Sequence, residues 1–310
     1  MGIEASCFRV AQGKPERVVA GCGRGIHWND ETMLRRNAIA SLLATGAWTK
    51  GVAWAKGIDR LFAGAHGACV LVDRKTRRLM AAHAPELAGG SAALPGSTLK
   101  PLVLNALLER GLVRADDGFP CPGDLRLGGR SFACSHPPLG APVTVRSAIA
   151  YSCNCFAAHY ASRFRAGELT RALERWGLGS RTGWFGEREG AGRVWDAPPE
   201  LQALGEDGVL VTPASLALAY CRLAARAAPP VLAGMADAVS FGTAQRAQVT
   251  GLRVAGKTGS VRTPAGVYLA WFAGFTDAAV VTVMLQGRSG GADAAPVAGR
   301  ILEAHWKGRL

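Results

Sequence analysis

Ser97 and Lys100 form the first pair of residues in this sequence whose types and spacing could support nucleophilic chemistry. They lie three positions apart in the segment 95–101, which reads PGSTLKP. Residues at i and i+3 share one face of a helix, so this spacing brings a hydroxyl and an amine within hydrogen-bond reach. A serine at the start of a helix is also a common N-cap, so the pair alone does not identify a nucleophile.

A second polar group consists of Ser152 and Asn154, which flank Cys153 directly after an apolar helical stretch at 145–151. A serine and an asparagine two positions apart suit a loop that points both side chains into a cleft. Both residues also favour ordinary turns, so this group is equally weak when it is considered alone.

The third group is the segment 256–260, which reads GKTGS and lies within a predicted strand. Its two glycines let a ligand or another part of the chain approach the backbone closely. A Walker-type phosphate loop is excluded, because Lys257 precedes Thr258 and Gly259 instead of closing a glycine-rich run.

The elements that must position these groups follow from hydrophobic periodicity and turn residues. Residues 68–73 and 78–83 are two largely apolar runs on either side of a polar turn at 74–77, which predicts a β-hairpin. Three more strands are expected near the C-terminus at 251–261, 267–275 and 278–285. Between these two blocks the pattern is helical, and a final helix is expected near the end of the chain. The predicted helices are 31–43, 48–62, 97–108, 144–163, 166–176, 212–226 and 294–306.

This order of elements predicts an α/β fold with a five-stranded antiparallel sheet flanked by helices. A helical subdomain is inserted between the first two and the last three strands, and the two outer blocks must close into one sheet, because neither alone can bury both faces. We expect an N-terminal helical segment without an assigned role at 1–65 and one large domain at 66–310. Within that domain, 66–97 and 240–310 would form the sheet subdomain and 98–239 the helical subdomain.

In this order the three groups read S-x-x-K, S-x-N and K-T-G, which are typical of penicillin-binding proteins and related β-lactamases. The sequence resembles the transpeptidase domain of a penicillin-binding protein over about residues 66–306. The segments 176–183 (WGLGSRTG) and 271–275 (WFAGF) are also similar to that family, as is the stretch 208–220. In this last stretch Ser215 replaces the usual glutamine.

The resemblance implies that Ser97 attacks the carbonyl of a D-alanyl-D-alanine bond and forms an acyl-enzyme, with Lys100 as its base. Burial and the nearby Lys257 cation would lower the pKa of Lys100, so that the amine is neutral. Ser152 would relay the proton to the leaving group, and Asn154 would orient Lys100 or the substrate amide.

The same resemblance implies a substrate-binding role for the strand at 257–260. Lys257 and Thr258 would hold the terminal carboxylate of the stem peptide or of a β-lactam, and Gly259 belongs to this binding segment. The N–H groups of Ser97 and Ser260 would form the oxyanion hole. Ser260 stands where the family often has threonine, which is a mild departure because the backbone provides the donor.

The acceptor of the acyl group decides the reaction, since an amine gives a cross-link and water gives hydrolysis. We expect a peptidoglycan D,D-transpeptidase that β-lactams inhibit. The alternatives are a D,D-carboxypeptidase, a β-lactamase, or a sensor domain that is acylated without turnover. The E-x-x-L-N segment of class A β-lactamases and the S-x-V motif of class D enzymes do not occur in the sequence. Four glutamates nevertheless lie in the region where a water-activating carboxylate is expected: Glu187, Glu189, Glu200 and Glu206.

The formal net charge of +13 indicates an acidic partner. Nucleic acid is not expected, because the arginines are scattered and no binding motif occurs. An anionic membrane or wall polymer fits better. The resemblance implies an extracytoplasmic protein that works with a glycosyltransferase or a membrane-anchored cell-wall protein. No apolar stretch of about 18 residues occurs in the sequence, so we expect the anchor to come from a partner or from a longer form of the protein.

Eight cysteines leave the state of the thiols open. Cys121 and Cys134 flank a glycine-rich turn, and they could be free thiols, a disulfide or, with His136 as a third ligand, part of a zinc site. The zinc interpretation lacks a C-x-x-C pair and is not favoured by the sequence. We therefore expect no cofactor and no metal among the site residues.

Overall fold

The computed structural model describes residues 57–62, 64–263 and 265–310, which all belong to a unit that begins at Lys50. The predicted helix at 31–43 and most of the one at 48–62 lie outside the described residues. The described end of the latter forms helix α2 (Ile58–Phe62). No helix among the described residues is both long enough and apolar enough to cross a membrane.

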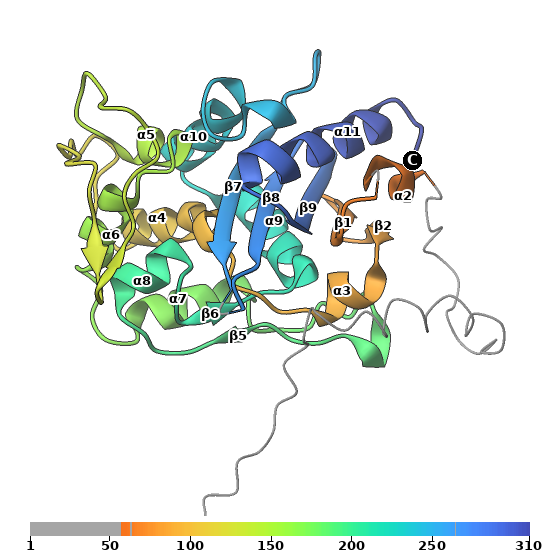
Figure 1. The fold of residues 1–310 in the computed structure, drawn as a ribbon, viewed down its shortest axis with the longest axis horizontal. Coiled ribbons are helices and arrows are strands. Elements are labelled where there is room, and N and C mark those ends of the chain that lie inside the picture. The colour runs from red at the N-terminus through yellow and green to blue at the C-terminus, as the bar shows by residue number, and fades with distance from the viewer. Residues whose placement is uncertain (1–56, 63, 264) are drawn as a thin grey trace, which may run out of the picture. The chain divides into compact units, whose positions relative to one another are not determined.

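A five-stranded antiparallel sheet carries the fold, as the sequence predicts (Figure 1). Its order is β2-β1-β9-β8-β7, so the N-terminal hairpin adds to the C-terminal meander through β1 and β9. These two strands pair from Gly67 with Leu285 to Asp73 with Ala279. The strands are β1 (Gly67–Asp73), β2 (Leu79–His83), β7 (Ala255–Arg262), β8 (Tyr268–Phe275) and β9 (Ala279–Gln286).

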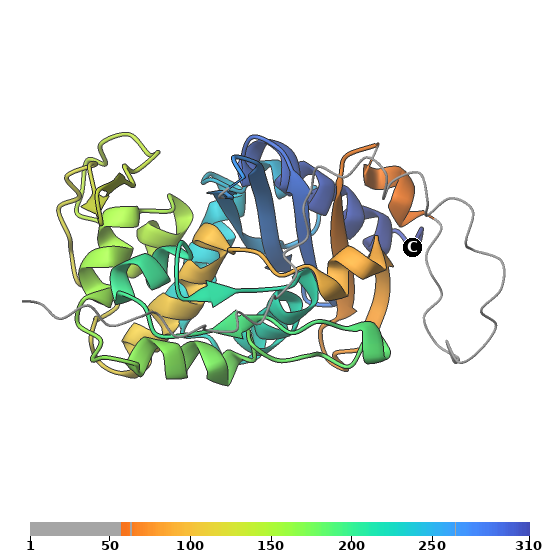
Figure 2. The same cartoon turned by 60° about the horizontal axis from the view of Figure 1, so that its bottom comes forward.

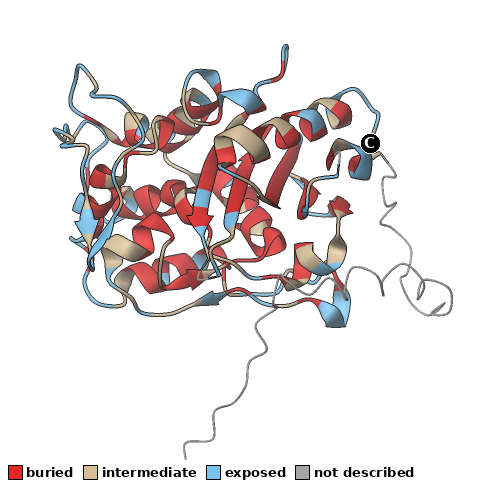
Figure 3. Cartoon of the chain, viewed as in Figure 1, coloured by how far each residue is buried: buried red, intermediate tan, exposed pale blue. Residues whose placement is uncertain are grey.

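Two helices cover opposite faces of this sheet. Val281 and Val283 of β9 belong to the buried cluster that includes residues of α11 (Ala295–Trp306). Successive side chains of a strand point to opposite faces, so Thr282 points the other way. There its hydroxyl donates to the carbonyl of Pro213, the first residue of α9 (Pro213–Arg226). Burial is correspondingly concentrated in the strands and the helices packed on them (Figure 3).

The inserted helical part lies at the β7 edge of the sheet, shown in yellow to green in Figures 1 and 2. Two short ladders accompany it, one between β3 (Arg126–Leu127) and β4 (Arg130–Ser131) and one between β5 (Arg193–Val194) and β6 (Val209–Leu210). Helix α10, which follows α9, is not anticipated by the sequence pattern. The helices of this part, together with α3 from the sheet side, are α3 (Pro85–Gly90), α4 (Lys100–Glu109), α5 (Val145–Ala150), α6 (Asn154–Ala161), α7 (Glu168–Trp176), α8 (Pro199–Leu204) and α10 (Pro229–Ser240).

The structure corrects the prediction of one continuous helix at 144–163. This stretch forms two helices, α5 and α6, because Ser152 adopts a left-handed backbone conformation with φ of 59°. Such a conformation is unusual for a residue with a side chain and stops a helix. The break turns the second polar group toward the interior instead of leaving it on a helix surface.

Capping residues explain where two of the helices begin. The Thr144 hydroxyl accepts from the backbone N–H of Ser147, and the Ser147 hydroxyl accepts in return from the backbone N–H of Thr144. Thr212 and Ser215 repeat this capping box at the start of α9. A capping box satisfies two otherwise unpaired N–H groups. Ser215, which departs from the usual glutamine of the family, therefore has a structural role at this helix start.

Candidate active site

Ser97 lies in a short 3₁₀ turn, η1 (Gly96–Leu99), that leads directly into α4. Two buried hydrogen bonds hold this turn. Thr98 donates to the carbonyl of Pro95 (2.8 Å), and the Tyr220 hydroxyl donates to the carbonyl of Thr98 (2.6 Å). Ser97 itself remains partly exposed. The turn therefore presents one accessible hydroxyl on a rigid support.

Glycines allow this turn to pack directly on β7. A β-carbon on Gly259 would lie only 2.5 Å from the carbonyl oxygen of Pro95, and one on Gly96 would lie 2.7 Å from the side chain of Val261. Gly96 also has a φ of 53°, which favours glycine. The backbone nitrogen of Ser260 would be 3.3 Å from the same Gly96 β-carbon. The Ser260 backbone nitrogen thus lies beside the nucleophile turn, and its part in an oxyanion hole stays a prediction.

Lys100 is completely buried, and its amine joins the first and second polar groups. Its Nζ donates to the Ser152 carbonyl (2.6 Å), to the Ser152 hydroxyl (3.3 Å) and to Oδ1 of Asn154 (2.5 Å). Three acceptors match the three N–H bonds of a charged amine. Loss of one proton would leave Nζ with a lone pair and two hydrogen bonds.

Burial lowers the pKa of Lys100 to about 8. The sequence predicts that the charge of Lys257 lowers the pKa of Lys100, but the repulsion between the two lysines affects Lys257 instead. The pKa of Lys257 is lowered well below its usual range, first by burial and then by the charge of Lys100. In the part of the chain that the structure describes, no hydrogen bond joins the Ser97 hydroxyl to Nζ. The two residues are linked by the Lys100 N–H, which donates to the Ser97 carbonyl.

Asn154 is held so that its oxygen must face Lys100. Its amide nitrogen donates to the carbonyls of Phe132 (2.9 Å) and Ala133 (3.3 Å), which can only accept. The preceding Ser152 is fixed by backbone bonds around the left-handed residue, including one from Cys153 N–H to the Ala148 carbonyl. The second polar group therefore acts as a preset acceptor for the lysine.

The residues predicted to bind substrate lie on β7, the strand that packs against the nucleophile turn. Lys257 is completely buried, and its Nζ donates to the Thr258 carbonyl (3.0 Å). The Thr258 hydroxyl donates to that of Thr243 (3.1 Å), a residue that follows α10 and that no sequence motif marks. The Ser260 hydroxyl accepts from Gly290 N–H (3.0 Å).

Of the four glutamates considered for water activation, Glu187 is exposed and Glu200 is half-buried, whereas Glu189 and Glu206 are held by hydrogen bonds. Glu189 is buried and accepts hydrogen bonds from the Thr182 hydroxyl and from the backbone of Thr182 and Gly183, so its carboxylate stabilises a loop. Glu206 pairs with Arg130 (2.6 Å), and burial raises its pKa. Gly205, the residue before Glu206, accepts a hydrogen bond from Gly96 N–H, so Glu206 directly follows a residue that contacts the nucleophile turn.

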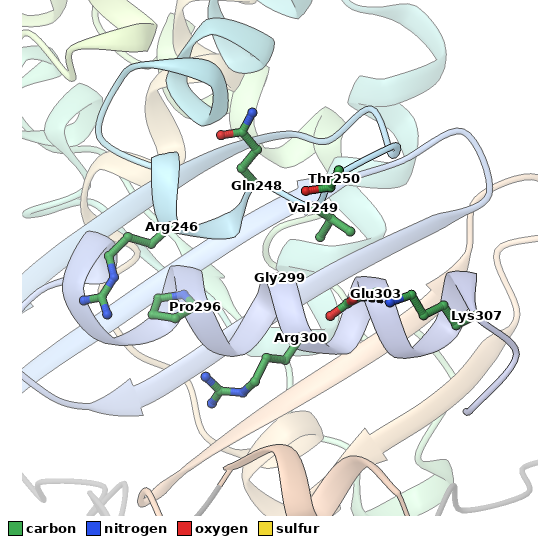
Figure 4. A pocket seen from close by; sticks show the side chains of 9 residues that line it. All are labelled: Arg246, Gln248, Val249, Thr250, Pro296, Gly299, Arg300, Glu303 and Lys307. Atoms are coloured by element: carbon green, nitrogen blue, oxygen red, sulfur yellow. Dashed lines mark hydrogen bonds and ion pairs between the residues drawn. The ribbon is translucent and has the colours of Figure 1, made fainter.

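A polar hollow between α11 and the segment 246–250 contains none of the predicted residues (Figure 4). Its cations already have partners: Arg246 donates to the Ala292 carbonyl, Arg300 to the Leu61 carbonyl, and Lys307 to Glu303. We therefore assign it no role in the chemistry.

The two cysteines of the glycine-rich turn are free thiols in the structure. The sulfur atoms of Cys121 and Cys134 lie 3.7 Å apart, so the disulfide alternative is not formed. Cys153 and Cys155, on either side of Asn154, lie 3.8 Å and 3.6 Å from Cys134. In the sequence these two cysteines flank Asn154, but nothing in it indicates that they contact the glycine-rich turn between Cys121 and Cys134.

Comparisons with known proteins agree with the observed fold. A family model described as penicillin binding protein transpeptidase domain matches residues 67–303. Pseudomonas aeruginosa PBP2 in complex with WCK 5153 is similar in structure, with a TM-score of 0.71 and 21% identity over 80% of this chain and 75% of the other. A peptidoglycan glycosyltransferase from Burkholderia ambifaria gives 0.70 and 23% identity, over 82% and 92%. PBP2 in its complex with MreC from Helicobacter pylori gives 0.68 and 17%, over 80% and 62%. The search of curated proteins found no match.

Proposed function

Because the chain belongs to the penicillin-binding protein transpeptidase family, we propose that it is a peptidoglycan D,D-transpeptidase with Ser97 as its nucleophile. The observation that carries this proposal is the buried amine of Lys100, which Ser152 and Asn154 hold one turn from the partly exposed Ser97. A buried amine of lowered pKa beside an accessible hydroxyl is the arrangement that acyl transfer through a serine needs.

In the proposed acylation step, the Ser97 oxygen attacks the carbonyl carbon of the D-alanyl-D-alanine bond and its proton passes to neutral Lys100. The oxyanion that forms accepts from the N–H groups of Ser97 and Ser260. The C–N bond then breaks, and the proton reaches the departing amine through Ser152. Lys257 and Thr258 hold the terminal carboxylate, and this anion favours the charged form of Lys257.

An amine acceptor is the proposed second half of the reaction. Support comes from the glutamates, because Glu189 is occupied by loop hydrogen bonds and Glu206 by Arg130. Both of these carboxylates already have hydrogen-bond partners. A carboxypeptidase or β-lactamase remains the second candidate function, and Glu206 is the residue that favours it, since burial raises the pKa of this carboxyl near the nucleophile turn.

We also propose that the protein acts outside the cytoplasmic membrane together with a glycosyltransferase or a membrane-anchored cell-wall protein. In support, two similar structures come from complexes, one of PBP2 with MreC from Helicobacter pylori and one of a peptidoglycan synthase complex. The net charge of +13 fits an anionic membrane or wall polymer nearby.

The proposed function is tested by supplying a stem-peptide donor and an amine acceptor and measuring the cross-linked product. We expect product from the unaltered chain and none above background from Ser97→Ala. Ser91→Ala is the matched control, because Ser91 is a buried serine whose hydroxyl has no hydrogen-bond partner among the described residues, so its removal should leave activity unchanged. Release of free acid without cross-linked product would identify a hydrolase instead.

The lowered pKa of Lys100 predicts how acylation depends on pH. Only the neutral amine can take the Ser97 proton, so the acylation rate should rise with pH and level off above about 8. At pH 6 about one molecule in a hundred has neutral Lys100, which predicts a rate about 100-fold below the plateau. Stopped-flow labelling with a fluorescent penicillin between pH 6 and 9.5 measures this profile. A rate independent of pH would contradict the role of Lys100 as base.

A further inference from the structure

Three thiols and an imidazole converge beside the Ser152–Asn154 turn. The sulfur of Cys121 lies 3.5 Å from that of Cys153 and 3.7 Å from that of Cys134, and the latter two are 3.8 Å apart. Nε2 of His136 lies 3.8 Å from the Cys121 sulfur. All four donor atoms are within 4.8 Å of one another.

These separations match a tetrahedral zinc site. Zinc–sulfur bonds of about 2.3 Å place two thiolates of a tetrahedron about 3.8 Å apart. A disulfide would need the sulfur atoms about 2.05 Å apart, so none of the three pairs has that geometry. Three cysteines and one histidine are also a common ligand set for structural zinc.

The surroundings of these side chains prepare them as ligands. Nδ1 of His136 faces the carbonyl of Pro137 at 2.8 Å, and a carbonyl can only accept, so the proton lies on Nδ1. Nε2 then has its lone pair free on the side of Cys121. A metal-binding histidine is commonly oriented by such a bond from its other nitrogen.

Backbone N–H groups point at each of the three sulfur atoms. Gly123 donates to Cys121 (3.4 Å), Asn154 to Cys134 (3.3 Å) and Phe156 to Cys153 (3.4 Å). Donors of this kind stabilise the negative charge of thiolates and are typical of the second shell of a metal site.

We propose that Cys121, Cys134, His136 and Cys153 bind one Zn²⁺ ion, and that this metal fixes the turn that presents Ser152 and Asn154 to Lys100. On binding, the three thiols lose their protons to solvent and the histidine binds as the neutral imidazole. The second part of the proposal rests on the proposed function, because it assigns the metal a positioning role for the base.

The path from the metal to the base is short. Cys153 is the residue between Ser152 and Asn154, and Asn154 N–H bonds to the sulfur of Cys134. The carbonyls that orient the Asn154 amide belong to Phe132 and Ala133, which directly precede Cys134. A bound metal would therefore fix two segments around Asn154. One is the loop whose carbonyls accept from the Asn154 side-chain amide, and the other is the helix start that contains the Asn154 backbone.

Cys155 is placed in the surroundings of this site and not among its ligands. Its sulfur lies 3.6 Å from Cys134, but it donates to the carbonyl of Asp124 (3.4 Å). We therefore expect Cys155→Ala to retain the metal. Loss of zinc in Cys155→Ala together with its retention in His136→Ala would overturn the assignment of histidine as the fourth ligand.

The test measures zinc by mass spectrometry of the full chain purified with a thiol reductant. We expect about one zinc per chain, its loss in Cys134→Ser, and its retention in the matched control Cys221→Ala, whose buried thiol lies in α9 away from the cluster. In case Cys134→Ser fails to fold, the unaltered chain loaded with Co²⁺ should show intense thiolate charge-transfer absorption. A chain that binds neither zinc nor cobalt, or in which any two of the three cysteines form a disulfide, would overturn the proposal.

The positioning role has its own measurement. Removal of zinc with a chelator should slow labelling by a fluorescent penicillin at least tenfold, and added zinc should restore the rate. If labelling is the same with and without the metal, zinc has no positioning role. If zinc binds but nothing labels Ser97 under any condition, the proposed function fails and the metal site stands.

Discussion

A chain in which Lys100 is replaced by methionine should react with a fluorescent penicillin about 10²- to 10⁴-fold more slowly than the unaltered protein, which is the usual loss when a general base is removed. Methionine fills a similar volume in this buried position but cannot accept the Ser97 proton. It also leaves the Ser152 carbonyl and Asn154 oxygen without a donor, at a cost of about 1–3 kcal/mol in the free energy of unfolding.

Labelling of the Lys100→Met variant is measured per folded molecule, with the folded fraction taken from thermal unfolding. Lys75→Met is the control, since Lys75 is an exposed lysine in the β1–β2 turn. It should label at the normal rate. A Lys100→Met protein that labels within threefold of the unaltered chain would show that another group takes the proton.

Replacing Asn154 with alanine should slow acylation by about 10- to 100-fold, because a base displaced by about an ångström loses that much rate. The change removes the Oδ1 acceptor of Lys100 and frees the carbonyls of Phe132 and Ala133. The amine then keeps only its bonds to Ser152. Stopped-flow labelling at several pH values separates this loss from a shift in the pKa of Lys100.

Asn105→Ala is the matched control for this prediction. The side chain of Asn105 also links two segments of the helical part, because its Oδ1 accepts from Ala228 N–H (2.8 Å). Its amide nitrogen donates to Glu109, so neither of these bonds involves a residue of the three polar groups. We expect it to lose about 1–3 kcal/mol of stability without a change in the labelling rate of folded protein. Equal slowing of both variants would mean that Asn154 contributes only to stability.

The predicted five-stranded sheet is confirmed. It could be predicted because short segments of sequence are enough to indicate its strands. Short apolar runs mark β1 and β2, and the apolar meander at β8 and β9 supplies the strands they join. Closure of the two blocks into one sheet follows from burial, since an isolated hairpin cannot cover its faces. The family is likewise confirmed, because its motifs are short and ordered along the chain.

The local geometry of the site is where the sequence is least informative. The periodicity predicts one helix over 144–163, although Ser152 and Asn154 also suit a loop. The left-handed Ser152 breaks this helix, and the break directs Asn154 to Lys100. Thr243 reaches Thr258 only through the packing of α10, a helix that the periodicity did not reveal.

The thiol cluster illustrates the same limit. Its members come from a loop at 121–136 and from the break before α6, and none of them forms a C-x-x-C pair. Sequence spacing alone therefore does not favour zinc, because the proximity of Cys153 to Cys121 depends on the tertiary fold. The structure brings three sulfur atoms together at the separations of a tetrahedral site, and this geometry favours zinc over a disulfide.

The central claim is that Ser97 carries the acyl group, and peptide mapping of the penicillin adduct by mass spectrometry tests it most directly. We predict one adduct per chain on the peptide that contains Ser97, long-lived in water, and no adduct in Ser97→Ala. An adduct on a different residue would show that Ser97 is not the nucleophile. Loss of the adduct from Ser97 within seconds would identify a β-lactamase and contradict the proposed transpeptidase.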